Sequence, residues 1–297
     1  MDFLGDNRHY SMSQKPSEQK RRFELKAENF GTKWLDLQFP FACDVHFSYM
    51  HAIRNDRFKV LLLLTEPEPI RMPEEDLAIH WAKFDLIVSH EERHKKYPNV
   101  VVMDYWDTYI KDYPLKKEFD VSTLVSIGGG PRNMDGYLLR EELYHRRSEI
   151  NIPHRFFASS RLANWESLGL PKLPNNAKDA LFTSMFHIAI ENVIQPDLFT
   201  EKIGDCFKTF TIPIYRGCPH TADYGIDDRG IIRFNTINEC IDICNRLTPD
   251  DYYSRMEYMT ANCRLMESKE NWLSRVKSLI LNTWSDKQQN LWPPQGA

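Results

Sequence analysis

The sequence predicts an α/β protein built on parallel sheets. Short buried strands, such as residues 58–64 and 186–190, alternate with helical segments that are apolar on one side, such as residues 74–84 and 137–147. This alternation is typical of a parallel sheet with helices on its faces. It occurs once on each side of a polar segment at residues 112–121. We therefore predict two Rossmann-like α/β domains facing a central cleft, with a boundary near residue 118.

The composition excludes several classes of protein. The chain has 297 residues, of which 42% are hydrophobic and 27% charged, and its formal net charge is −4. These values are ordinary for a globular protein and carry no basic footprint for nucleic acid. The longest aliphatic run, residues 60–64, is far too short to span a membrane, and residues 1–25 lack the apolar core of a signal peptide. We expect a soluble, cytoplasmic protein. Its six cysteines form no Cys-x-x-Cys pair, so we expect free thiols.

In the first half, two glutamates follow a buried strand. The strand at residues 58–64 runs into Thr65-Glu66-Pro67-Glu68-Pro69, where the alternating prolines exclude both helix and strand. Glu66 and Glu68 are therefore expected on a stiff loop at the carboxyl end of a strand, where open α/β sheets bind their ligands. Asp76 follows at the start of the next helical segment.

A zinc-protease pattern, His-Glu-x-x-His, occurs at residues 90–94. Such a motif binds zinc only when both histidines share one face of an α-helix. Here the pattern directly follows the strand at residues 84–89 and is followed by Pro98. We expect a surface loop or a short turn rather than a zinc site.

The second half begins with a strand, a glycine-rich turn and a helix. Residues 122–127 are the strand, Gly128 opens the turn Gly-Gly-Gly-Pro, and residues 137–147 are the helix. Backbone N–H groups in such a turn, together with the helix N-terminus, suit an anion. Arg140 lies in the first two turns of that helix and adds a full positive charge.

The most informative stretch runs from residue 186 to residue 219. A buried strand ends at the polar pair Glu191-Asn192, and after a loop Thr200 is a candidate N-cap for a helix that opens with Glu201-Lys202. A short strand at residues 212–215 follows and ends at a glycine. The dipole of the helix N-terminus and the charge of Lys202 favour a phosphate or diphosphate.

This stretch resembles the donor-binding core of the α-1,3/4-fucosyltransferase family. The resemblance has fixed internal spacing, which makes it far more specific than a short motif. It is carried by Glu191, Asn192, Thr200, Glu201, Lys202, Pro213, Ile214, Gly217 and Pro219.

The family implies the GT-B fold of inverting glycosyltransferases. Residues 1–118 would then form the acceptor-side domain, residues 119–270 the donor-binding domain, and residues 271–297 a helix that crosses back to the first domain. The lack of an N-terminal membrane anchor resembles the soluble bacterial or viral members.

The resemblance also implies roles for single residues. Glu66 matches the general base, although its Thr and Pro neighbours depart from the Gly-Glu-Asn turn of the family, which leaves Glu68 and Asp76 as alternatives. Arg140 matches a phosphate-binding arginine. With Lys202 and the helix N-termini it would stabilise the departing diphosphate, because the chain has no Asp-x-Asp motif for a metal. We expect no cofactor and no metal.

The remaining donor contacts follow from the same resemblance. Asn192 and Glu201 would hold hydroxyls of the ribose or the sugar. From their places in the sequence, Gly128 is a candidate for the anion-binding turn, and Tyr215, beside the Gly217 turn, is a candidate for lining the nucleotide pocket. The partners would be a nucleotide-sugar donor, GDP-fucose first, and a glycan acceptor. A UDP-pentose donor and a non-catalytic module that binds nucleotide sugars or glycans are the alternatives. The oligomeric state stays open.

Overall fold

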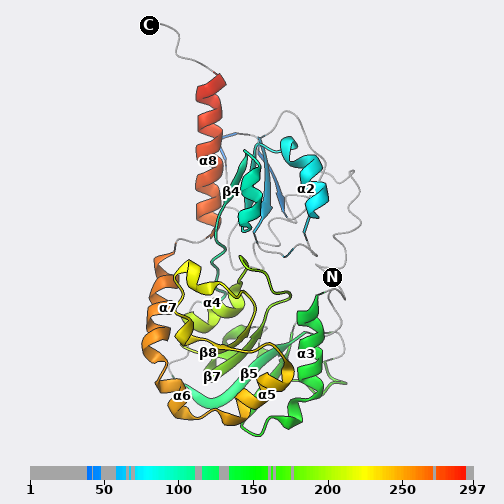
Figure 1. Ribbon diagram of the computed structural model, residues 1–297, viewed down its shortest axis with the longest axis vertical. Coiled ribbons are helices and arrows are strands. Elements are labelled where there is room, and N and C mark those ends of the chain that lie inside the picture. The colour runs from blue at the N-terminus through cyan, green and yellow to red at the C-terminus, as the bar shows by residue number, and fades with distance from the viewer. Residues whose placement is uncertain are drawn as a thin grey trace. The chain divides into compact units, whose positions relative to one another are not determined.

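The computed structural model divides the chain into two compact units (Figure 1). The C-terminal unit is Trp106–Lys269, and the N-terminal unit comprises the described residues up to Tyr105 together with the last helix. The structure describes residues 39–41, 43–47, 58–64, 67, 71–110, 116–126, 134–159, 162, 165–174, 177–269 and 272–291. The predicted fold class, α/β with Rossmann-like units on parallel sheets, is confirmed.

The N-terminal unit contains a four-stranded parallel sheet in the order β1-β2-β3-β4. The two inner strands, β2 and β3, are mostly apolar, as expected for a parallel sheet covered on both faces, whereas in the edge strand β1 Asp44 and His46 alternate with apolar residues. The strands are β1 (Cys43–Phe47), β2 (Phe58–Leu63), β3 (Leu86–Ser89) and β4 (Val100–Val102). The helices are α2 (Glu74–His80), α8 (Trp272–Leu291) and the short 3-10 helices η3 (Trp81–Lys83) and η4 (Glu92–Lys96).

Alternate residues of β2 contribute to two different cores. Leu62 packs in one cluster with Trp272 and Val276 of α8. Leu61 packs in the other with Leu77 of α2. The apolar side of α8 therefore covers one face of this sheet, and α2 belongs to the cover of the other.

The C-terminal unit contains a five-stranded parallel sheet in the order β6-β5-β7-β8-β9. The central strand β7 is buried along its whole length. The strands are β5 (Glu118–Val125), β6 (His154–Ala158), β7 (Ser184–Ile190), β8 (Ile212–Arg216) and β9 (Ile232–Arg233). The helices are α3 (Asp135–His145), η5 (Arg147–Glu149), η7 (Lys178–Thr183), α4 (Glu201–Lys208), η8 (Thr221–Tyr224), η9 (Asp228–Gly230), α5 (Ile237–Arg246), α6 (Pro249–Tyr253) and α7 (Met256–Ser268).

The strand order reverses between β5 and β7. From β5 the chain passes through α3 to the outer strand β6, and from β7 it passes through α4 toward β8, in the opposite direction. Right-handed crossovers therefore place α3 and α4 on opposite faces of the sheet. Consistently, α3 packs with α5 and α4 packs with α7 (Figure 1). The reversal makes the carboxyl ends of β5 and β7 the expected place for a ligand.

Two helix predictions were wrong in their extent. The helix predicted at residues 74–84 ends at His80 and continues as the 3-10 helix η3, because Asn99 Nδ2 donates to the carbonyl oxygens of Trp81 (3.0 Å) and Phe84 (2.8 Å). The sequence also predicts a single helix at residues 252–266, whereas the structure divides this stretch between α6 and α7. A capping box at Thr248 begins α6 at Pro249, three residues before the predicted start. Arg255, with φ −101° and ψ −2°, lies between α6 and α7.

Among the described residues, no helix combines the length and apolar character that a membrane span requires. All six cysteines lie within these residues as free thiols, five of them buried.

Candidate functional site

The polar residues at the end of β7 lie at the point where the strand order reverses. Glu191 directly follows β7, and its N–H donates to the carbonyl oxygen of Arg216 (2.8 Å). Glu191 is only 3% exposed, whereas Asn192 is half-buried. Both residues therefore lie at the carboxyl edge of the sheet, beside the first turns of α3 and α4.

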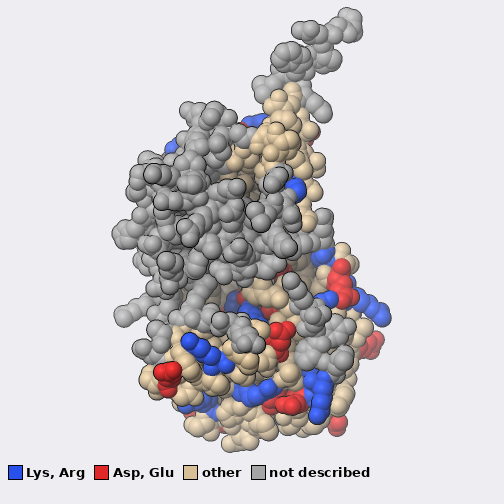
Figure 2. Space-filling model, turned by 180° about the vertical axis from the view of Figure 1, so that it is seen from behind, with Lys and Arg blue, Asp and Glu red and all other residues tan. Residues whose placement is uncertain are grey.

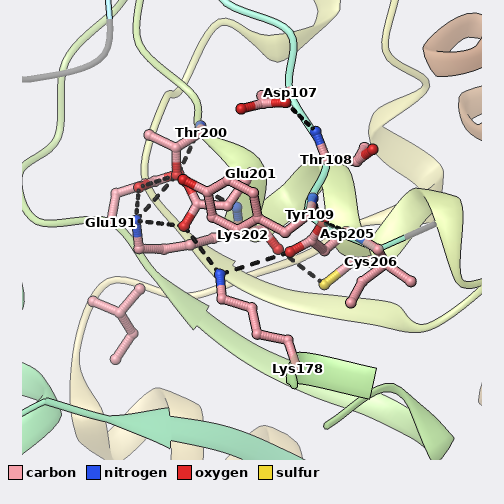
Figure 3. A network of polar contacts seen from close by, with 12 residues as sticks. Asp107, Thr108, Tyr109, Lys178, Glu191, Thr200, Glu201, Lys202, Asp205 and Cys206 are labelled. Atoms are coloured by element: carbon pink, nitrogen blue, oxygen red, sulfur yellow. Dashed lines mark hydrogen bonds and ion pairs between the residues drawn. The ribbon is translucent and has the colours of Figure 1, made fainter. Parts of the chain in front are cut away.

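Glu191 is the centre of a buried hydrogen-bond network (Figure 3). Its carboxylate accepts hydrogen bonds from the N–H of Thr200 (2.9 Å), the hydroxyl of Thr200 (2.9 Å) and Nζ of Lys202 (3.0 Å). The phenol of Tyr215 lies 3.5 Å away. Glu191 thus fixes the loop at residues 191–200 and holds the start of α4 against the end of β7.

The start of α4 has the predicted cap. Thr200 Oγ1 accepts from the N–H of Lys202 (3.4 Å), which confirms Thr200 as the N-cap. The ammonium of Lys202 also lies 3.0 Å from Thr200 Oγ1 and 3.9 Å from Glu201 Oε1. Burial opposes the charge on Lys202, but the carboxylates of Glu191 and Glu201 outweigh it and raise the pKa of Lys202 above its ordinary value.

Arg140 reaches the same segment from α3. Its Nη1 donates to the carbonyl oxygen of Ile190 (2.7 Å) and its Nη2 to Oδ1 of Asn192 (2.9 Å), while the guanidinium lies 4.5 Å from the ring centre of Tyr137. The residue is 7% exposed, and burial lowers its pKa. Within the part of the chain that the structure describes, its Nε makes no hydrogen bond. Arg140 and Lys202 therefore flank Glu191 and Asn192 from two helices.

Gly136 allows α3 to approach this segment closely. Its N–H donates to the carbonyl oxygen of Asn192 (3.1 Å), and a Cβ at this position would lie 1.9 Å from the carbonyl oxygen of Glu191. Any side chain would push α3 away and with it Arg140. Gly136 was not predicted as a site residue, although glycine in the first turn of a helix is a signal of close backbone approach.

Glu201 lies between two lysines. Its Oε1 is 3.3 Å from Nζ of Lys178 and 3.9 Å from Nζ of Lys202. Burial favours its neutral form, but the charges of Lys202 and Lys178 outweigh it and lower the pKa of Glu201 to about 2. The carboxylate is therefore ionised at physiological pH and can accept hydrogen bonds from hydroxyl groups.

Lys178 and Asp205 were also missed in the sequence. Nζ of Lys178 lies 3.7 Å from Oδ2 of Asp205, which is fully buried on α4. Burial raises the pKa of Asp205 to about 7, although the charge of Lys178 opposes this. No sequence pattern indicated these residues, because Lys178 lies in a segment without periodicity and a lone Asp in a helix normally faces solvent.

The charges around Glu191 leave a small positive excess. Arg140, Lys178 and Lys202 contribute three positive charges, and Glu191 and Glu201 contribute two negative ones, while Asp205 is mostly neutral below its raised pKa of about 7. On the face of the C-terminal unit seen in Figure 2, basic and acidic side chains are interspersed rather than gathered by sign. The excess of positive charge is therefore confined to the residues at the end of β7. The N-terminus of α4 adds the positive end of its helix dipole there.

Two other predicted donor-site residues have different outcomes. Tyr215 is fully buried beneath the network, where its hydroxyl accepts from the N–H of Cys218 (3.1 Å). Tyr215 therefore packs beneath Glu191 and is not exposed to solvent. Gly128 lies outside the described residues.

A cavity of about 430 Å³ lies at the same edge, between α3 and the start of α5. An ion pair from Arg216 Nη2 to Asp135 Oδ2 (2.6 Å) forms part of its wall. Glu142 and Arg146 also line it, so its acids and bases balance. The cavity therefore has no charge excess for an anion, in contrast to the residues around Glu191.

The predicted general bases belong to the N-terminal unit. Glu66 and Glu68 lie outside the described residues. Asp76 is exposed in the first turn of α2.

The His-Glu-x-x-His pattern lies at the carboxyl end of β3 and in η4, not in an α-helix. His90 Nδ1 contacts the carbonyl oxygen of Leu63 (2.8 Å), whereas His94 contacts Ser89 Oγ (2.7 Å) and Glu74 Oε2 (2.8 Å). The two rings thus have separate partners. In the described ranges, no group of three or more His, Cys, Asp or Glu residues could hold a metal ion.

No protein-family model matches the sequence. Solved structures of α1,3-fucosyltransferase are similar at low identity. One is 14% identical with a TM-score of 0.44 and covers 76% of this chain and 79% of its own. A structure with GDP is 14% identical with a TM-score of 0.48 (88% and 89% covered), and one with GDP-fucose is 15% identical with a TM-score of 0.46 (76% and 79% covered). The function proposed below therefore rests on the site and on the sequence motif.

Proposed function

We propose that the protein is an inverting glycosyltransferase whose C-terminal unit binds the diphosphate of a nucleotide sugar. The observation that carries this proposal is the convergence of Arg140 and Lys202, from two different helices, on Glu191 and Asn192. This convergence lies at the reversal of strand order, where open α/β sheets bind ligands. Two cations and a helix N-terminus are a common solution for binding phosphate.

In the proposed reaction, Arg140 and Lys202 stabilise the charge that develops on the leaving diphosphate. Glu191 keeps the ammonium of Lys202 in place through the 3.0 Å contact, so Lys202 is oriented before the donor arrives. Because these cations are fixed in advance, little reorganisation is needed in the transition state. We propose that no metal ion is required.

Asn192 and Glu201 bind hydroxyl groups of the donor in this proposal. Glu201 is suited to the role because its carboxylate is ionised and 15% exposed. Asn192 is half-buried with its Oδ1 held by Arg140, which leaves the side-chain amide to donate.

The acceptor is proposed to bind on the N-terminal unit. A carboxylate takes the proton of the acceptor hydroxyl as its oxygen bonds to the anomeric carbon and the bond to the diphosphate breaks. Glu66 is proposed for this role, with Glu68 and Asp76 as alternatives. The acceptor is a glycan hydroxyl.

The donor we propose is GDP-fucose, because residues 186–219 resemble the donor-binding core of the fucosyltransferases over their whole length. A UDP-pentose is the alternative donor. A non-catalytic module is the second candidate function, and it is favoured by the departure of Thr65-Glu66-Pro67 from the family's turn.

The test is a turnover assay with GDP-fucose and UDP-xylose, each with a panel of glycan acceptors and each with and without EDTA. We expect release of nucleoside diphosphate that depends on the acceptor, and its loss in Glu66→Ala and in Lys202→Met. Lys208→Met is the matched control, because it removes a lysine and an ion pair from the other end of α4. Donor binding without turnover would establish the non-catalytic module, and turnover abolished by EDTA would contradict metal independence.

A further inference from the structure

Lys178 is a third cation beside the proposed diphosphate site. It is the first residue of η7, and its side chain is 22% exposed. Its Nζ lies 3.3 Å from Glu201 Oε1, 3.7 Å from Asp205 Oδ2 and 4.3 Å from the ring centre of Tyr109 (Figure 3). Two carboxylates and an aromatic face therefore hold the ammonium in one place.

Asp205 is built into the fold as a support for this ammonium. Its Oδ1 accepts from the N–H groups of Tyr109 (2.6 Å) and Ile110 (3.3 Å), which leaves Oδ2 on the side of Lys178. Among the described residues, Oδ2 has no hydrogen-bond partner. A Cβ on Gly204 would lie 2.4 Å from the carbonyl oxygen of Asp107, so α4 packs closely against this segment. Asp205 therefore has little freedom to move.

Lys178 is the cation nearer to Glu201. Its Nζ is 3.3 Å from Glu201 Oε1, compared with 3.9 Å for Lys202. The shorter contacts of Lys202, both 3.0 Å, are with Glu191 and Thr200. Lys178 therefore makes the closer contact and helps to orient the Glu201 carboxylate, although the charge of Lys202 has the larger effect on the pKa of Glu201.

We propose that Lys178 is a positioning residue of the donor site, which holds the Glu201 carboxylate in place to bind the ribose hydroxyls of the donor and does not itself contact the donor. This inference rests on the proposed function. Lys178 acts through Glu201, and Asp205 keeps Lys178 within reach.

The same geometry has a consequence for pH. The charged groups that face Glu201 are Lys178, Lys202, Arg140 and Asp205. Burial favours the protonated form of Glu201, and the two lysines oppose it. Removal of Lys178 leaves the effect of burial less opposed, so the pKa of Glu201 rises in the variant.

The test is a double-mutant cycle on the full chain, read by calorimetric titration with GDP and with UDP. We expect Lys178→Met and Glu201→Gln each to weaken binding about tenfold, the loss of one charge-assisted hydrogen bond. The double variant should bind within about twofold of Glu201→Gln, because both changes remove the same interaction. Lys178→Arg should retain affinity within about threefold, and Lys208→Met should match the wild type.

A second readout separates positioning from a merely structural role. The ratio of wild-type to Lys178→Met affinity should widen as the pH falls toward the raised pKa of Glu201 in the variant, and this widening should vanish in the Glu201→Gln background. If the two single substitutions act independently, the double variant should bind about a hundredfold more weakly than the wild type. That result would overturn the role of Lys178 but not the proposed function. A wild-type protein that binds neither GDP nor UDP would instead overturn the proposed function. If Lys178→Met does not fold, the ratio of wild-type to Lys178→Arg affinity is measured over the same pH range. We expect this ratio to stay constant, because arginine keeps a cation beside Glu201, and a ratio that changes with pH would overturn the inference.

Discussion

The substitution Glu191→Gln tests whether the centre of the site network also stabilises the fold. It keeps the size and shape of the side chain but removes its charge. The glutamine oxygen can still accept from Thr200, whereas its amide nitrogen replaces the oxygen that faces Lys202. The variant therefore loses one charge-assisted hydrogen bond, the 3.0 Å contact to Lys202 Nζ.

The magnitude follows from the burial of the two partners. A hydrogen bond to a charged group contributes about 1.5–3 kcal/mol, and removing one partner of a fully buried ion pair costs about 3–5 kcal/mol. Glu191 is 3% exposed, but the Lys202 side chain is 26% exposed, so solvent offsets part of the loss. We expect Glu191→Gln to lower the free energy of unfolding by about 2 kcal/mol, or the melting temperature by about 4–8 °C.

The measurement is urea unfolding of the wild type and the variant, with Glu149→Gln as the control. Glu149 pairs with Arg146 at 2.8 Å, but its side chain is 48% exposed, so its loss should be barely measurable. Equal stability of the two variants would refute the assignment of Glu191 as the buried centre of this network.

Three further predictions concern the same unit. Gly136→Ala should destabilise the fold by about 2–3 kcal/mol, because its Cβ would overlap the backbone of Glu191; a melting temperature unchanged from the wild type would contradict this close approach. The pKa of Asp205 is raised to about 7, so the folded state holds more protons than the unfolded state between pH 4 and 7, and this contribution to stability is lost as the pH rises. Asp205→Asn should therefore gain stability relative to the wild type between pH 5 and pH 8 in urea unfolding, and a constant difference would exclude the raised pKa. Thiol titration with Ellman's reagent should leave five cysteines unreactive until the protein unfolds, and fast reaction in the native state would contradict their burial; these are Cys206, Cys218, Cys240, Cys244 and Cys263.

The parallel-sheet fold was predictable because its strands are short, continuous apolar runs. Residues 58–64 and 186–190 lie in the middle of their sheets, so both faces of each strand require apolar side chains. By contrast, β6 was not predicted. It lies at the edge of the sheet, where His154 and Arg155 face partly outward, so its sequence shows neither a continuous run nor a clean alternation.

The candidate site was predictable where a local signal exists. Thr200 and Lys202 were found because an N-cap and the first turn of a helix are adjacent in the sequence. Asp205 and Lys178 carry no such signal. Asp205 is bound by backbone groups 95 and 96 residues away in the chain, and only the folded structure brings them together.

Calorimetric titration with GDP measures whether Arg140 and Lys202 bind a diphosphate, as the proposed function requires. We expect the wild type to bind GDP, and Lys202→Met and Arg140→Gln each to bind at least about tenfold more weakly, with binding that weakens further as salt is added. A wild-type affinity retained in both variants, or no detectable binding of GDP or UDP to the wild type, would contradict the account.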